Sequence, residues 1–306
     1  MVGIVFYDEV RKGINSRAEA LRMLRAFLDK NEPKLVYWLQ HTWRLQGNAI
    51  TYKELREAIM NGFLDQQTIE EWQQDYAKFV IEHLQPMYIL AMEEATKKLS
   101  KQYPLFAFDP MAEGVKKWTD VSGAKFVTNS TNEQIAAVRH VVARASQLHD
   151  MNVDGLAKAI RAMVGLTKPQ ANANLNFYTK MIESGVSESK ALERSIRYSA
   201  RQSRYRGYMI ARTELAFAYN KGEQIGVVEA VNQGMMGETR KIWCTADDER
   251  VCEICGGLEG KSVALVDGFK FPTRLRAIEP TIDQTPPAHP HCRCAVLYEE
   301  MSPPRF

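Results

Sequence analysis

Two short cysteine clusters constrain this chain more than any other sequence feature. The stretch RVCEICGGLEG at 250–260 contains two cysteines three residues apart, and PPAHPHCRC at 286–294 contains two more cysteines and two histidines. The whole chain of 306 residues has only five cysteines, so four of the five fall in these two stretches. Ordinary buried thiols need no such clustering. The pattern favours one site that both stretches build together.

The spacing within the clusters is typical of a metal site. A Cys-x-x-Cys turn directs two thiolates at one ion, and a second cluster supplies the other ligands of a tetrahedron. His289 and Cys292 repeat the spacing of the first pair, so the preferred ligand set is Cys252, Cys255, His289 and Cys292. Cys294 is an alternative to His289, because residues i and i+2 of a strand face the same way. His291 is a further possible donor.

The cellular compartment that the sequence indicates is consistent with a metal site. An odd number of cysteines and an N-terminus without a secretory leader argue against a disulfide framework and for a reducing cytosol. A catalytic zinc would keep an open position beside a base, and no His-x-Glu motif accompanies these cysteines. We therefore expect structural Zn²⁺. Cys244 lies outside both clusters, and we expect it in the core.

Helical periodicity covers most of the chain before residue 236. Thr51 and Glu54 predict a capping box, and the long helical pattern at 68–99 predicts a bend or break near Pro86. After Gly237 the stretches TRKIWCTA, KSVALVDGFKF and CRCAVLYEE predict strands. The expected fold class is mainly α, a helical body with a small C-terminal α+β subdomain clipped by zinc.

Composition shifts predict three regions. Residues 103–132 are rich in Pro, Gly, Ser, Thr and Asn, which marks a boundary. We predict an N-terminal helical region at 1–120, a central helical domain at 121–236 and a Cys/His-rich zinc-binding α+β segment at 237–306. No stretch approaches the roughly 18 uninterrupted apolar residues of a membrane span, so we expect no membrane partner.

A row of arginines is the clearest candidate binding surface. The net charge is only +3, so affinity for nucleic acid would have to come from a local patch. Helical spacing places four arginines on one face, a fifth extends the row, and tyrosines interleave them. This surface suits packaged DNA or an acidic partner, while a solvated helix face is the alternative. The five residues are Arg194, Arg197, Arg201, Arg204 and Arg206.

Three linked blocks resemble one family. The runs YMIARTELAFAYNKGEQIG, KIWCTADDERVCEICGGLEGKSV and PPAHPHCRC resemble the Mu-F-like minor head proteins of tailed bacteriophages, also called phage head morphogenesis proteins. The matching positions are Arg212, Thr213 and Glu214 in the first block, Trp243, Asp248, Arg250, Cys252 and Cys255 in the second, and Pro287, His289, Pro290, Cys292, Arg293 and Cys294 in the third. The stretch RLRAIEPTIDQT lengthens the last loop.

The non-cysteine positions in these blocks have structural interpretations. We expect Arg212 and Glu214 to form an ion pair that positions the zinc-binding end against the helices. Asp248 is placed to cap the turn that presents Cys252, and Trp243 and Arg250 belong to the same structural block.

The resemblance implies a virion protein present in few copies, at the portal vertex or in the head interior, and assembled in the host cytoplasm. Its implied partners are the portal protein, the major capsid protein or both, and packaged DNA, with roles in head morphogenesis and in DNA packaging or ejection. The family is not one of established enzymes, so we expect no catalytic residue and no enzyme activity.

The alternative function is a metal-dependent nuclease of the treble-clef type. In that case Cys252, Cys255, Cys292 and Cys294 would hold zinc, and His289 or His291 would activate water. The sequence lacks the Asn and the second downstream His that such a nuclease usually brings.

Overall fold

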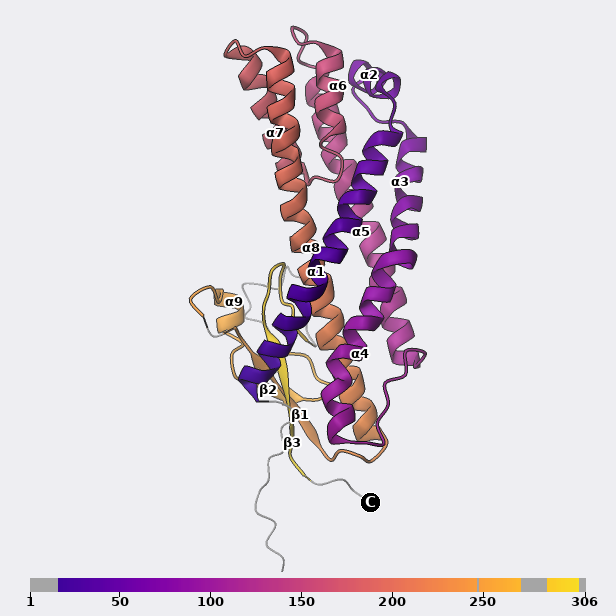
Figure 1. Cartoon of the computed structure of the whole chain (residues 1–306), viewed down its shortest axis with the longest axis vertical. Coiled ribbons are helices and arrows are strands. Elements are labelled where there is room, and N and C mark those ends of the chain that lie inside the picture. Colours follow the sequence, from indigo (N-terminus) through magenta and orange to yellow (C-terminus); the bar gives the residue numbers. More distant parts are fainter. Residues whose placement is uncertain (1–15, 247, 271–284, 303–306) are drawn as a thin grey trace, which may run out of the picture. The chain divides into compact units, whose positions relative to one another are not determined.

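The computed structural model describes residues 16–246, 248–270 and 285–302. Its helices and strands are shown in Figure 1. None of the helices in these ranges combines the length and the apolar content that a membrane span requires. In chain order the elements are α1 (Arg17–Ala49), α2 (Tyr52–Asn61), α3 (Gln66–Phe79), the π-helix η1 (Val80–Leu84), α4 (Gln85–Gln102), α5 (Glu113–Ala145), α6 (Val153–Arg161), α7 (Lys168–Glu183), α8 (Glu188–Asn232), β1 (Thr239–Cys244), α9 (Glu253–Gly256), β2 (Ser262–Ala264) and β3 (Ala295–Glu300).

The chain divides into two compact units. Unit 1 comprises Met1–Asn31, Met87–Lys117 and Arg212–Phe306, and unit 2 comprises Glu32–Pro86 and Trp118–Ala211. These units do not follow the predicted boundaries at residues 120 and 236. The reason is that α1, α4, α5 and α8 each contribute residues to both units, so each unit is assembled from segments far apart in the sequence.

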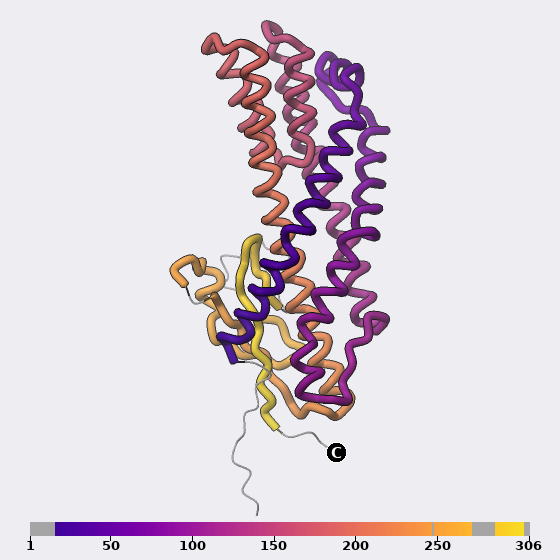
Figure 2. Tube along the Cα trace, in the orientation of Figure 1, coloured from indigo at the N-terminus to yellow at the C-terminus, as the bar shows by residue number. Residues whose placement is uncertain are grey.

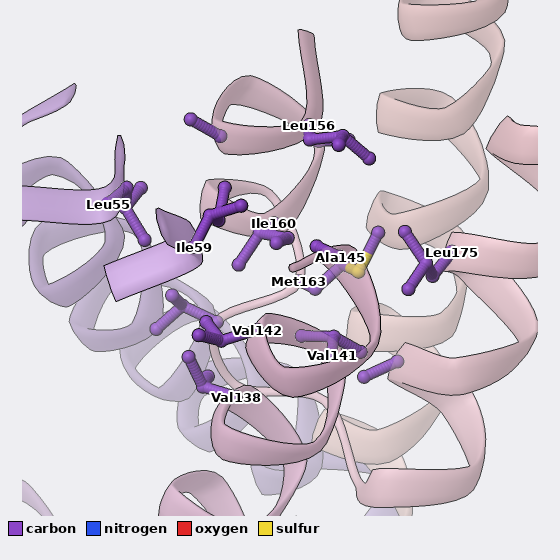
Figure 3. Packing of buried hydrophobic residues seen from close by; sticks show 14 of the residues in the cluster. Leu55, Ile59, Val138, Val141, Val142, Ala145, Leu156, Ile160, Met163 and Leu175 are labelled. Atoms are coloured by element: carbon purple, nitrogen blue, oxygen red, sulfur yellow. The ribbon is translucent and has the colours of Figure 1, made fainter. Parts of the chain in front are cut away.

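Unit 2 has an apolar core built by several helices. Figure 3 shows Leu55 and Ile59 of α2, Val138 and Val142 of α5, and Ile160 of α6 pointing into this core. All five side chains are almost completely buried. After the turn at 184–187, the chain trace in Figure 2 shows α7 and the first part of α8 side by side, where Phe177 and Tyr198 are in ring contact. Burial of this apolar surface is the main stabilising contribution to the unit.

The predicted irregular stretch at 103–132 is wrong over most of its length, because α5 runs unbroken from Glu113 to Ala145. Buried apolar residues recur at helical spacing in its C-terminal part, from Val138 to Ala145, whereas the part before residue 132 also buries small polar side chains such as Ser130 and Thr131. Gly123 permits close packing, since a Cβ atom there would lie 2.7 Å from a methyl group of Val80. The Thr128 hydroxyl donates to the Ala124 carbonyl, 3.1 Å away, and thus finds its partner within the helix. Glycine, serine and threonine often occur in turns, but here they belong to a continuous helix because their small side chains allow close packing.

Two local predictions are confirmed. Thr51 and Glu54 form the capping box of α2, with their two reciprocal hydrogen bonds at 3.2 and 2.7 Å. The disturbance expected near Pro86 is the π-helix η1, which ends at Leu84, two residues before the proline. A proline ring clashes with the carbonyl four residues earlier in a regular α-helix, and the wider π turn relieves that clash.

Unit 1 contains the sheet. Its three antiparallel strands have the order β2-β1-β3, with Ile242 opposite Leu297 and Lys241 opposite Val263. The predicted mainly α fold with a small sheet near the C-terminus is therefore confirmed, but the sheet is not a subdomain of its own, since helical segments belong to the same compact unit. In the helical part of unit 1, α8 packs closely on α4 at Gly222, where a Cβ atom would lie 2.4 Å from the Met92 Cα.

Candidate metal centre

Five predicted donors come together in unit 1. The Nε2 atom of His289 lies 3.1 Å from the Cys252 Sγ and 3.2 Å from the Cys255 Sγ. The Cys255 Sγ lies 3.7 Å from the Cys292 Sγ. Cys255, Cys292 and Cys294 form a second group of three, whose sulfurs all lie within 4.8 Å of one another. The cluster can hold a metal ion.

The backbone around Cys252 presents the first two thiols. Cys252 is the N-cap of α9, and its Sγ accepts a hydrogen bond from the Cys255 amide at 3.4 Å. Before this turn, the Asp248 carboxylate accepts a hydrogen bond from the Arg250 amide at 3.0 Å. Asp248 thus caps the turn directly before Cys252, and its expected role for the Cys252 turn itself stays a prediction.

The second pair of cysteines comes from the segment that leads into β3. Cys292 and Cys294 are buried, and β3 begins at Ala295, directly after them. Trp243 of β1 is fully buried in the same apolar cluster and meets the Phe269 ring edge-on, with 5.1 Å between ring centroids. Because β3 is held in the sheet, the backbone that carries Cys292 and Cys294 is held in place at the site.

A hydrogen bond fixes the tautomer of His289. Its Nδ1 atom lies 2.8 Å from the Pro290 carbonyl, which can only accept, so Nδ1 carries the proton. The lone pair of the neutral ring is then on Nε2, the atom that faces the two thiols. Metal-binding histidines commonly have this arrangement.

The distances suit a tetrahedral ion. Two sulfurs that each lie about 2.3 Å from one ion are roughly 3.7 Å apart in a tetrahedron. The Cys255–Cys292 separation of 3.7 Å has this value. The two groups of three donors share Cys255, so the ligand set is drawn from both. His291 belongs to neither group among the described residues; its backbone is left-handed, with φ 64°, and its amide lies 3.4 Å from the Thr213 hydroxyl.

The neighbouring sulfurs and burial disfavour the thiolate form of Cys255. Hydrogen bonding with the Cys292 and Cys294 sulfurs, together with burial, raises the pKa of the Cys255 thiol far above its usual range. A bound cation reverses this preference, since metal ligation deprotonates thiols. Cys244 is buried in β1 as expected, and burial raises the pKa of its thiol to about 12.

Two further residues of the family-like blocks, Asp248 and Glu214, have partners within unit 1. The Arg293 guanidinium donates two hydrogen bonds to Asp248, at 2.5 and 2.7 Å, and holds the pKa of that carboxyl below its usual value. The Glu214 carboxylate accepts a hydrogen bond from the Tyr88 hydroxyl. Tyr88 is 126 residues away in the sequence, so no local pattern could have indicated this partner. The expected Arg212–Glu214 ion pair stays a prediction.

The structure corrects one member of the arginine row on α8. Arg194, Arg197, Arg201 and Arg204 are exposed, and Arg197 pairs with Glu193 at 2.5 Å. Arg206 does not belong to this surface, because its side chain is 1% exposed. Its guanidinium donates hydrogen bonds to the Gly165 carbonyl and to the Glu133 carboxylate within unit 2. The Arg206 side chain is therefore paired within the fold. The predicted insert at 274–285 lies almost entirely outside the described residues.

Comparison with known proteins gives one match. The family model described as Phage Mu protein F like protein matches residues 151–297. No curated protein and no solved structure matches the chain.

Proposed function

Because residues 151–297 of this chain belong to the Phage Mu protein F-like family, we propose that the protein is a minor head protein of a tailed bacteriophage that acts in head morphogenesis. The observation that carries the proposal is the extent of the match, which includes both cysteine clusters and the exposed arginine row. In this role the protein docks on the portal protein, the major capsid protein or both, and it is part of the virion.

We assign the Cys/His cluster a structural Zn²⁺ ion. Thiolate and imidazole ligands in tetrahedral arrangement are the preferred environment of zinc in proteins. The donor groups contain five donors, enough to supply four protein ligands, and Cys255, Cys292 and Cys294 are buried. A closed set of four protein ligands leaves no position for substrate, which favours a structural role. The ion would tie the α9 turn to the segment that leads into β3.

We propose that the chain has no hydrolytic activity on nucleic acid. A nuclease would need a free base within hydrogen-bond reach of a metal-bound water. Within the described residues, the donor groups contain cysteines and one histidine and no carboxylate. The histidine of the cluster faces two thiols through Nε2 and so acts as a ligand in the proposed site.

The exposed arginines of α8 supply a surface for a partner. Four guanidinium groups on one helix face suit an acidic surface of a head component or the phosphates of packaged DNA. Since this face belongs to unit 2, its loss should leave the metal centre of unit 1 intact.

Co-purification tests the proposal. The full chain is co-expressed with the portal protein or the major capsid protein encoded in the same phage genome, and complexes are analysed by size-exclusion chromatography. We expect co-elution with one of the two head components. The metal-loaded protein, incubated with plasmid and Mg²⁺ or Mn²⁺, should leave the plasmid intact.

A result with neither head component in the complex and with plasmid cleavage would contradict the proposal. Cleavage lost in His291→Ala but kept in the exposed-surface variant His149→Ala would promote the nuclease.

A further inference from the structure

A cavity of about 710 Å³ lies in unit 1, and no residue of the arginine row of α8 lines it. Figures 1 and 2 show the first part of α1 beside the strands, and the cavity lies along this part of the helix. Arginines and leucines dominate its walls. The residues that line it are Arg17, Ala18, Leu21, Arg22, Leu24, Arg25, Leu28, Asp29, Arg212, Ala246, Asp248, Arg250 and Arg293.

One side of the cavity is a single face of α1. The lining positions on this helix form two adjacent rows, one starting at Arg17 and one at Ala18, and within each row the steps are four, three and four residues, which keeps both rows on one side of the helix. Leu24 and Leu28 form a buried apolar floor on this face, and Arg22 and Arg25 are exposed beside it. A helix face that combines buried leucines with arginines at its edge can hold a ligand that is partly apolar and partly anionic.

The charge of the walls is strongly positive. Six arginines and two aspartates line the cavity within the described part of the chain. Arg17 pairs with Glu259 at 2.7 Å, and Arg293 pairs with Asp248. In the described residues, no ion pair engages Arg22, Arg25 or Arg250. An excess of guanidinium groups over carboxylates at one cavity favours an anionic ligand.

The segment that carries the metal donors supplies the other side. Arg250 precedes Cys252 by two residues, and Arg293 lies between Cys292 and Cys294. The Arg293 side chain is held by its two hydrogen bonds to Asp248, whose own position is fixed by the Arg250 amide. Guanidinium groups on this side therefore project from a constrained backbone, which lowers the entropic cost of binding a ligand.

We propose that this cavity binds the phosphate groups of a nucleotide, either free or at the exposed end of a nucleic-acid strand. The planar guanidinium matches the geometry of phosphate oxygens and binds them through paired hydrogen bonds. The leucine floor accommodates the sugar or base that the phosphate carries. A carboxylate ligand would use the same donors but fewer of them, because phosphate offers more acceptor oxygens.

Calorimetric titration of the full chain tests this site with three probes: inorganic tripolyphosphate, dATP and a single-stranded deoxythymidylate 12-mer. We expect binding to the wild type, with Kd for tripolyphosphate and dATP increased about tenfold or more in the variant Arg22→Gln/Arg25→Gln, since two charge-assisted contacts are lost. Arg250→Gln removes a guanidinium from the opposite wall and should weaken binding in the same direction.

The matched control is Arg240→Gln/Lys261→Gln, which removes two exposed cations of unit 1 that do not line the cavity. Its Kd for tripolyphosphate and dATP should stay within about twofold of the wild type, because only contacts at the cavity carry specific affinity. Near-UV circular dichroism shows whether each variant keeps its fold.

The probes also distinguish the two sources of phosphate. If the 12-mer loses affinity in Arg22→Gln/Arg25→Gln by the same factor as dATP, the ligand is the end of a nucleic-acid strand. If the 12-mer instead depends on Arg197, Arg201 and Arg204 alone, the cavity takes a free nucleotide. Absence of binding by all three probes at millimolar concentration would overturn the proposal, as would equal affinity in the wild type and the Arg22→Gln/Arg25→Gln variant.

Discussion

Glu214 shows how one residue couples this fold to pH. Its carboxylate lies against the Tyr88 hydroxyl, and burial raises its pKa to about 7, although the hydrogen bond from Tyr88 acts in the opposite direction. The folded state therefore keeps the Glu214 proton at pH values where the unfolded chain has already released it. The charged form is the unfavourable one in the fold.

The variant Glu214→Gln should remove this pH dependence. In the wild type, the free energy of unfolding should fall as pH rises from about 4.5 to about 7 and then level off, because the unfolded state loses its proton first. The full effect is roughly 3 to 4 kcal/mol, since the pKa rises from 4.5 to about 7 and one pKa unit corresponds to about 1.4 kcal/mol. Urea unfolding at several pH values between 5 and 8 measures the difference between variant and wild type.

The exposed Glu238 provides the control for this experiment. Glu238→Gln should keep the pH dependence of the wild type, because its carboxylate is in solvent. Stability curves of Glu214→Gln that run parallel to the wild type across this pH range would contradict the role of Glu214.

At the scale of elements, the sequence was informative where a pattern is local. The capping box at Thr51 and the strands β1 and β3 follow from spacing within short stretches. The gathering of Cys252 and Cys255 with His289 joins two separate stretches, and it follows from the ligand types and the equal spacing in both. The part of α5 before residue 132 could not be predicted from periodicity, because it packs through small and polar residues, whereas its second part, from Asn132 on, follows from helical periodicity. The arginines of α1 were missed at the cavity because their neighbours come from segments more than 180 residues later.

The metal centre gives a prediction for the elements around it. Cys252→Ser and Cys292→Ser should lower bound zinc well below the expected one equivalent and weaken amide protection in β1, β2 and β3. Helical circular dichroism should remain nearly unchanged, because among the described helices only the four-residue α9 carries a donor of the cluster. Structural zinc sites bind with apparent free energies of about 10 kcal/mol or more, so the loss should be clear by elemental analysis.

Two further variants identify the fourth ligand. His289→Ala should lose zinc and Cys294→Ser should retain it, because His289 Nε2 is the atom closest to the first cysteine pair. The reverse result would assign the position to Cys294. Cys244→Ser is the control, since Cys244 is buried in the sheet but belongs to neither donor group. Full zinc content in Cys252→Ser would rule out the proposed centre.

At the scale of the whole molecule, the residues that the family model matches do not coincide with either compact unit. Residues 151–297 contribute to both compact units, and residues before 151 complete each of them. A sequence comparison therefore detects only part of what must fold together. The segments before residue 151 had no resemblance to suggest their role, yet they supply α1 and with it one wall of the basic cavity.

Mass spectrometry of purified virions tests the central claim most directly. Particles of the phage that encodes this chain are purified by density gradient, and peptides of this protein are quantified against the portal and the major capsid protein. The account predicts its presence in few copies per particle, at a constant ratio to the portal protein. Absence from purified particles, in cells whose lysate contains the protein in abundance, would contradict a role in the phage head.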